Sequence, residues 1–302
     1  MNLQLIAQQR KDDIQLDFNF SGKNVLITGG SLGLGFETAK LFVRNGADVI
    51  ICSRNINELE SAASKLSGEK INSSQQIRFM KADVGNTGDI DSLFAYSGTP
   101  DVLVTCAGLY GPIGAIENNS WDEWEYTLRV NLFGTVYCIR KAVSLWKSEK
   151  RGGKIVCLSG GGATKGMPNF SSYAASKSAV VRTVETIALE NKDSGIYINA
   201  VAPGALNTRM LDQALNAGQN AAGPDTYRKL IAQKENGGAS IENAAELIAF
   251  LASDMSDGIT GKLISAVWDD WKEFHEHKKF LENPEIYTLR RIIPDSLKEE
   301  RL

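Results

Sequence analysis

The chain has 302 residues, which is enough for one large α/β domain or two small ones. Its apolar and charged fractions, 43% and 23%, are ordinary for a soluble globular protein. A net charge of −3 gives no electrostatic attraction toward nucleic acid or an anionic membrane. No apolar run is long enough to span a bilayer. The first residues are interrupted by Gln, Arg, Lys and Asp, so we expect no secretory signal.

The cysteines and histidines predict neither a disulfide nor a metal site. The cysteines are far apart and form no CxxC pair: Cys52, Cys106, Cys138 and Cys157. Buried free thiols in a reducing compartment, the cytoplasm, are the expected outcome. His275 and His277 lie two residues apart in a charged segment, a spacing that does not place both on one helical face.

Strand-length apolar runs alternate with helix-length segments along the whole chain. In chain order the runs are 24–28, 48–52, 77–84, 101–108, 153–160, 196–204 and 262–267, with helical patterns at about 33–45 and 56–66. Continuous apolar strands that alternate with helices predict a parallel sheet covered on both faces. We therefore expect one doubly wound, Rossmann-type α/β domain over residues 21–268.

Two segments fall outside the alternation. Residues 1–20 precede the first run and predict a short amino-terminal arm. Residues 269–302 are charged with interspersed aromatic residues, and we expect this carboxyl-terminal extension to wrap the surface or a neighbouring subunit.

A glycine-rich turn follows the first predicted strand. The stretch NVLITGGSLGLGFETAKLF places Thr28, Gly29, Gly33 and Gly35 between a strand and a helix. Glycines allow backbone N–H groups at a helix N-terminus to approach a pyrophosphate. An ordinary glycine-rich turn is the alternative, but the position at the first strand-to-helix crossover favours nucleotide binding.

The end of the second strand indicates which dinucleotide is preferred. Ser53 and Arg54 stand where an NAD-binding site usually has a carboxylate for the ribose 2′-hydroxyl. A guanidinium suits a 2′-phosphate instead, although a solvated surface arginine is the alternative. We therefore expect NADP rather than NAD.

Tyr173 and Lys177 are four residues apart, so on a helix they share one face. A phenol of ordinary pKa, about 10, is a poor base at neutral pH. A neighbouring ammonium group, together with a positive nicotinamide, is expected to lower that pKa and make Tyr173 a proton-transfer group. Taken alone, a tyrosine and a lysine at this spacing could also occur by chance in a helix.

Taken together, the motifs resemble the short-chain dehydrogenase/reductase family from about residue 24 to residue 267. The matching segments are TGGSLGLG (28–35), ADV (82–84), TCAG (105–108), NLFGT (131–135), YAASK (173–177) and INAVAPGALNT (198–208). TCAG stands where the family usually has NNAG, so both asparagines are absent.

The resemblance implies an NAD(P)-dependent oxidoreductase that acts on a small carbonyl or alcohol substrate. It assigns catalysis to Tyr173, Lys177 and Asn131, where Lys177 also binds the ribose and Asn131 holds a water. The cofactor contacts expected from the resemblance and from the sequence are Gly29, Ser31, Gly33, Leu34, Gly35, Ser53, Arg54, Asp83, Val84, Ala107, Gly108, Tyr173, Lys177, Pro203, Gly204, Leu206 and Thr208. Family members commonly form dimers or tetramers through helices at about 120–148 and 171–194.

The third catalytic group of the family, a serine thirteen residues before the tyrosine, is missing. That position holds Gly160, and Ser159 stands one residue earlier. Three interpretations remain: a shifted loop that presents Ser159 or Thr164, hydrogen bonding by backbone N–H groups of the glycine run, or a non-catalytic nucleotide-binding protein. We favour an active enzyme, with Ser159 as a candidate catalytic residue, because the other three groups, Asn131, Tyr173 and Lys177, are present.

The region after the last cofactor segment is expected to contact the substrate. Residues 209–240 predict a hinged flap, although an exposed helix pair is an equally good interpretation. Trp268 and Trp271 could stack on a sugar ring or pack in the interior. The glycine run and the extension together resemble, weakly, family members of sugar and surface-polysaccharide metabolism.

Overall fold

The computed structural model of the chain describes residues 14 and 16–291. Most of the expected arm (1–20) and the end of the expected extension (292–302) lie outside the described residues. Within the described part, no helix is both long and apolar enough to cross a membrane.

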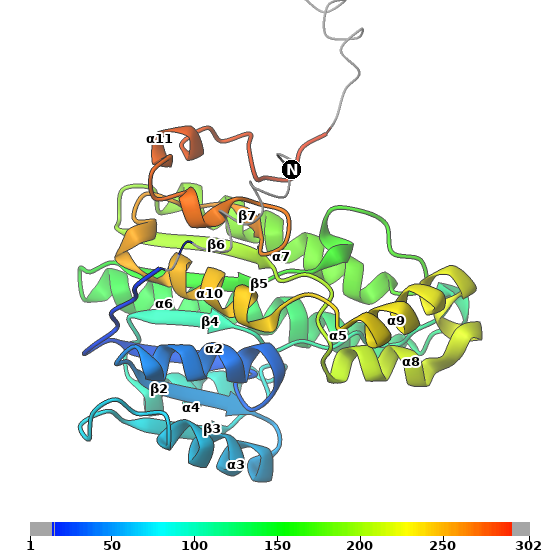
Figure 1. The fold of residues 1–302 in the computed structure, drawn as a ribbon, viewed down its shortest axis with the longest axis horizontal. Helices are drawn as coiled ribbons and strands as arrows, with labels where there is room; N and C mark the ends of the chain where they lie inside the picture. Colours follow the sequence, from blue (N-terminus) through cyan, green and yellow to red (C-terminus); the bar gives the residue numbers. More distant parts are fainter. Residues whose placement is uncertain (1–13, 15, 292–302) are drawn as a thin grey trace, which may run out of the picture.

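The core is one parallel sheet of seven strands in the order β3-β2-β1-β4-β5-β6-β7 (Figure 1). Each strand falls on a predicted apolar run: β1 (Asn24–Thr28), β2 (Asp48–Ser53), β3 (Ile77–Lys81), β4 (Val102–Thr105), β5 (Gly153–Leu158), β6 (Ile196–Ala202) and β7 (Leu263–Ser265). The strand order reverses between β1 and β4, which makes the sheet doubly wound. In such sheets ligands bind outside the carboxyl ends of the strands at this reversal.

Helices follow the strands and cover both faces of the sheet. They are α2 (Gly33–Arg44), α3 (Ile56–Ser67), α4 (Thr87–Ser97), α5 (Trp121–Leu128), α6 (Thr135–Ser148), α7 (Ser171–Glu190), α8 (Arg209–Ala222), α9 (Pro224–Asn236), α10 (Ile241–Ala252) and α11 (Lys278–Leu281). In Figure 1, α8 and α9 project beyond the carboxyl ends of the strands.

Side chains that alternate along each strand point to opposite faces of the sheet, and each face packs against its own layer of helices. In β1, Val25 and Ile27 pack into one cluster with α2, α3 and α10, whereas Leu26 packs into the other with α4, α6 and α7. Strands buried on both faces read as unbroken apolar runs, which is why their positions could be predicted. The predicted doubly wound α/β fold is confirmed.

The long helix expected over 120–148 is interrupted. A π-helical segment, Arg129–Gly134, separates α5 from α6. Such segments are rare and occur mostly at functional sites. This one carries Asn131, whose side chain is fully buried.

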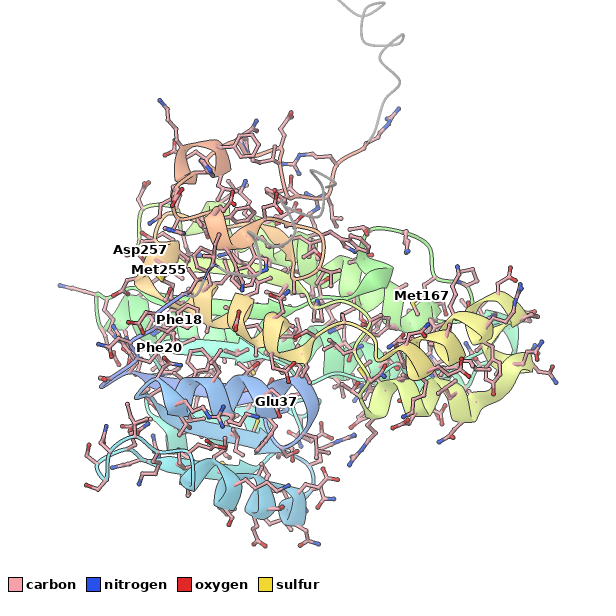
Figure 2. The ribbon with its side chains drawn as sticks, viewed as in Figure 1. Phe18, Phe20, Glu37, Met167, Met255 and Asp257 are labelled. Carbon is pink, nitrogen blue, oxygen red and sulfur yellow. The ribbon has the colours of Figure 1, made fainter. Side chains whose placement is uncertain are left out.

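Both ends of the described chain pack on the domain. Phe18 and Phe20, labelled in Figure 2, join the core, and Phe20 contacts Phe42 of α2 with ring centroids 4.7 Å apart. At the other end, the Leu263 N–H of edge strand β7 donates to Tyr287 O over 2.7 Å. The extension therefore covers the β7 edge of its own domain, where an unpaired strand would otherwise be exposed.

Candidate active site

The turn between β1 and α2 is tightly packed and leads into the N-terminus of α2. A Cβ at Gly35 would meet Gly29 O at 2.2 Å, and a Cβ at Gly29 would meet Ala107 N at 2.7 Å. The residue that caps α2, Leu32, makes no side-chain capping bond, so its first N–H groups have no such partner. A helix N-terminus of this kind accepts a phosphate.

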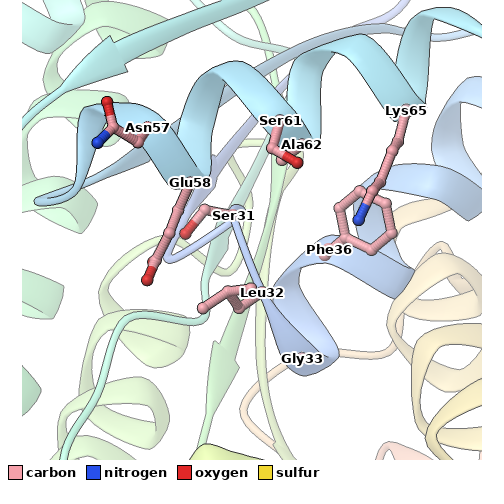
Figure 3. A pocket seen from close by; sticks show the side chains of 9 residues that line it. All are labelled: Ser31, Leu32, Gly33, Phe36, Asn57, Glu58, Ser61, Ala62 and Lys65. Carbon is pink, nitrogen blue, oxygen red and sulfur yellow. The ribbon is translucent and has the colours of Figure 1, made fainter.

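A cavity of about 300 Å³ opens between this turn and α3. Figure 3 shows Glu58 extending from α3 beside Ser31, and Lys65 extending beside Phe36. The full lining is Ser31, Leu32, Gly33, Phe36, Asn57, Glu58, Ser61, Ala62 and Lys65. The Glu58 carboxylate also pairs with Arg209 at the start of α8 over 2.8 Å, so α3 and α8 are linked across the turn.

Three polar side chains form a chain of hydrogen bonds at the ends of β2 and β3. Arg54 Nη1 donates to Tyr126 Oη over 2.8 Å, and Tyr126 Oη donates to Asp83 Oδ2 over 2.7 Å. Asp83 Oδ1 accepts from Gly85 N over 2.8 Å. Ser53 is partly exposed here, and Val84 is buried beneath.

Tyr173 and Lys177 lie on one face of α7, as their spacing predicts. Lys177 Nζ is 5.8 Å from the centroid of the Tyr173 ring and donates to Leu158 O over 2.8 Å. A Cβ at Gly108 would lie 3.5 Å from Lys177 Nζ. The structure thus brings the tyrosine and lysine to the loop after β4, at the carboxyl edge of the sheet.

Asn131 ties that loop to α7. Its Oδ1 accepts from Leu109 N over 2.9 Å, and its Nδ2 donates to Leu109 O over 2.9 Å and to Ser176 Oγ over 3.0 Å. Ser176 Oγ in turn donates to Tyr173 O over 2.7 Å. The amide therefore fixes the loop carrying Gly108 relative to the helix that carries Tyr173.

The pKa of the Tyr173 phenol is raised above its ordinary value, chiefly by burial and then by the neighbouring Tyr110. Within the protein, the cost of burying a phenolate outweighs the attraction of the Lys177 ammonium, so the lysine by itself does not lower this pKa. Burial also lowers the pKa of Lys177 to about 8. At neutral pH the phenol is protonated and the lysine is mostly charged.

Gly160 faces the tyrosine hydroxyl. A Cβ at Gly160 would lie 2.1 Å from Tyr173 Oη. The residue is extended (φ −179°, ψ 175°), and Ser159 N donates to Val201 O as β5 continues. Neighbouring side chains of an extended segment point to opposite sides, so Ser159 points away from Tyr173. Its hydroxyl is buried without a hydrogen-bond partner among the described residues, and the loop is not re-routed at Gly160.

The predicted cofactor segment 198–208 returns to the glycine turn and continues into α8 and α9. A Cβ at Gly33 would lie 3.5 Å from Thr208 Cγ2, so Thr208 sits beside the turn. Pro203, Gly204 and Leu206 precede it at the end of β6. The helices α8 and α9 then pack over Tyr173 through an apolar cluster formed by Phe170, Leu211, Ala214, Ala222 and Leu230, edged by Tyr110, Ile113, Met167, Met210, Leu215 and Tyr227. Figure 2 shows Met167 beside these helices.

Two tyrosines of the site were not predicted from the sequence. Tyr110 packs edge-on against Tyr173, with ring centroids 4.8 Å apart, and also against Phe170 at 5.2 Å. Tyr126 joins Arg54 to Asp83. Tyr110 lies two residues after the TCAG segment, and this proximity is a signal that could have been used, whereas no such signal marks Tyr126.

The chain matches known proteins over most of its length. Residues 29–266 match the family described as Enoyl-(Acyl carrier protein) reductase. The 3beta-hydroxysteroid dehydrogenase 1 of Eggerthella lenta is 32% identical over 250 residues, which are 80% of this chain and 91% of that protein. The glucose 1-dehydrogenase of Gluconobacter oxydans is 32% identical over 252 residues, which are 81% of this chain and 90% of that protein.

Solved structures share the architecture. A short-chain type dehydrogenase/reductase from Mycobacterium ulcerans superimposes with a TM-score of 0.72 at 26% identity, covering 84% of this chain and 91% of that chain.

Proposed function

Because the chain belongs to the short-chain dehydrogenase/reductase family, we propose that this oxidoreductase uses NADP(H) to interconvert a carbonyl and a secondary alcohol, with Tyr173 as its acid and base. One observation carries the proposal. Tyr173, Lys177 and Asn131 meet at the carboxyl edge of the sheet, next to the phosphate-accepting turn. The nicotinamide cofactor supplies the hydride chemistry when bound.

Tyr173 is poised to donate a proton. Its raised pKa keeps the phenol protonated at neutral pH, ready for the oxygen of a carbonyl substrate. In the opposite direction the phenolate takes the proton of an alcohol. The charge of Lys177, 5.8 Å from the ring centroid, stabilises the phenolate that forms.

We assign Gly160 to the position of the family's catalytic serine. Support comes from its Cβ direction, which points at Tyr173 Oη, and from Ser159, which points away. Loss of one preorganised donor typically costs a factor of about 10²–10³ in rate, which slows an enzyme without abolishing activity. Because Gly160 has no side chain, the Tyr173 hydroxyl lies in the space that a Cβ at this position would fill.

The preference for NADP is supported by Arg54. Its guanidinium is exposed at the end of β2, where a ribose 2′-phosphate would reach it. The neighbouring carboxylate, Asp83, is bonded to Tyr126 and to Gly85 N rather than to Arg54.

The lining around Tyr173 favours a substrate with an apolar body. Met167, Met210, Leu215 and Tyr227 edge the apolar cluster around Tyr173, and such surfaces bind aliphatic or aromatic rings. A sugar remains the second candidate, supported by the resemblance to a glucose 1-dehydrogenase and by Trp268, which is 85% exposed. Trp271 is not available for stacking because it is buried against Phe250.

We also propose a homo-oligomer, a dimer or a tetramer. Trp121 is 65% exposed on α5, and Phe133 is 56% exposed on the π-helical segment. Exposed aromatic residues on the helices that join subunits in the family support this assembly. Sedimentation of the full chain measures it, and a monomer at micromolar concentration would contradict it.

The oxidation of NADPH by a panel of cyclic ketones and keto-sugars tests the activity. Saturable loss of NADPH absorbance is expected with at least one apolar cyclic ketone. Tight NADPH binding with no turnover on any compound would favour the non-catalytic alternative, and turnover on keto-sugars alone would favour the second substrate class.

A further inference from the structure

We propose that Tyr126 is a positioning residue that sets the preference for the 2′-phosphate by keeping Arg54 apart from Asp83. The inference rests on the proposed NADP preference and adds a residue to it. Tyr126 lies on α5, far from the β2 turn in sequence, and the fold alone brings it to the adenosine end of the site.

The phenol bridges two opposite charges. Tyr126 Oη accepts from Arg54 Nη1 over 2.8 Å and donates to Asp83 Oδ2 over 2.7 Å. The Arg54 guanidinium carbon also lies 6.0 Å from the centroid of the Tyr126 ring. One hydroxyl therefore bonds to both the arginine and the aspartate, which form no direct ion pair with each other among the described residues.

Direct pairing would remove both groups from ligand binding. A guanidinium and a carboxylate that can reach each other frequently form a bidentate ion pair, although an exposed pair is worth only up to about 1 kcal/mol. Arg54 would then have fewer donors for a phosphate, and Asp83 would have fewer acceptors. With Tyr126 between them, Arg54 uses one of its five donors on the phenol, and no other partner of the guanidinium is found within residues 14 and 16–291.

The Tyr126→Phe variant removes the bridge and keeps the ring. Collapse of Arg54 onto Asp83 weakens NADPH binding more than NADH binding, because only NADPH carries the 2′-phosphate. We expect the ratio of the two dissociation constants, measured by fluorescence titration, to move by up to about fivefold toward NADH, because the 2′-phosphate must then compete with an exposed ion pair worth up to about 1 kcal/mol.

A matched control is present in the chain. Tyr137 on α6 also contacts a carboxylate, Asp91, at 3.1 and 3.2 Å, and its ring lies 5.7 Å from the Arg140 guanidinium carbon. Tyr137→Phe should leave the NADPH/NADH ratio unchanged. Thermal unfolding of both variants checks that each is folded.

The Arg54→Met variant separates this inference from the proposed function. Wild-type protein that binds NADH as tightly as NADPH would contradict the NADP preference itself. If wild type prefers NADPH and Arg54→Met abolishes the preference, but Tyr126→Phe does not change it, the role of Tyr126 is wrong. In the Arg54→Met background, Tyr126→Phe should change the ratio no further, and an additional shift there would also overturn the inference.

Discussion

The hydroxyl oxygen of Tyr173 lies where a side chain on Gly160 would begin, 2.1 Å from the ideal Cβ position. No Cβ tolerates such a distance, so serine cannot be restored here without moving the tyrosine. We therefore expect Gly160→Ser to lower kcat by a factor of about ten or more, because displacing the proton donor costs more than a new hydroxyl returns.

Gly161 provides the control for that variant. A Cβ on Gly161 would meet no atom within 4 Å, so Gly161→Ser should retain the wild-type kcat within about twofold. Steady-state rates of NADPH oxidation compare the two substitutions directly. A Gly160→Ser protein with a higher kcat than wild type would contradict this prediction, because it would show that Tyr173 can move aside without losing proton transfer.

The titration of Lys177 should make the kcat/KM for NADPH depend on pH. Its pKa is lowered to about 8 by burial, so the ammonium is charged below that pH and neutral above it. The kcat/KM for NADPH, which reports on the free enzyme, should be level at lower pH and fall as the pH rises through about 8. The raised pKa of Tyr173 adds no titration in this range.

In the Lys177→Arg variant the descending limb should disappear, because a guanidinium stays charged across the range even if the overall rate is lower. The measurement compares normalised pH profiles of the two proteins. A wild-type profile that remains level well above that pH would contradict the assignment to Lys177.

Substitution of Asn131 should lower the stability of the fold as well as the activity. Its buried amide satisfies the N–H and the C=O of Leu109 as well as the Ser176 hydroxyl. Asn131→Ala leaves the Leu109 N–H and C=O unpaired, while Ser176 keeps its bond to Tyr173 O, and it should reduce the free energy of unfolding by about 2–4 kcal/mol. Urea denaturation measures this change, with the exposed Asn118→Ala as a control expected to stay within about 0.5 kcal/mol.

Most of the fold could be predicted because its signals are local. The turn from Thr28 to Gly35 joins a strand to a helix within a few residues, and alternating apolar runs identify a parallel sheet. The π-helical segment was not predicted, because the bonds from Asn131 to Leu109 that accompany it join distant parts of the chain. The helix expected over 120–148 was implied by the family resemblance, which does not report this interruption.

The site was predicted as a set of motifs but not as a geometry. Counting back from Tyr173 predicted Gly160 at the position of the family's serine, and only the fold shows that the tyrosine hydroxyl lies in the space next to this glycine. Spacing on α7 placed Lys177 beside Tyr173 correctly, but the raised phenol pKa follows from burial and from Tyr110, which spacing does not report. The Arg54–Tyr126 contact joins residues 72 positions apart and has no local signal.

Tyr173→Phe tests the central claim most directly, because it removes one hydroxyl from a buried ring and leaves the packing against Tyr110 in place. NADPH oxidation with an active carbonyl substrate and NADPH binding are measured on the same preparation. The account predicts that turnover falls to background while the dissociation constant for NADPH stays within about twofold of wild type. A phenylalanine variant that turns over at a rate close to wild type would contradict it.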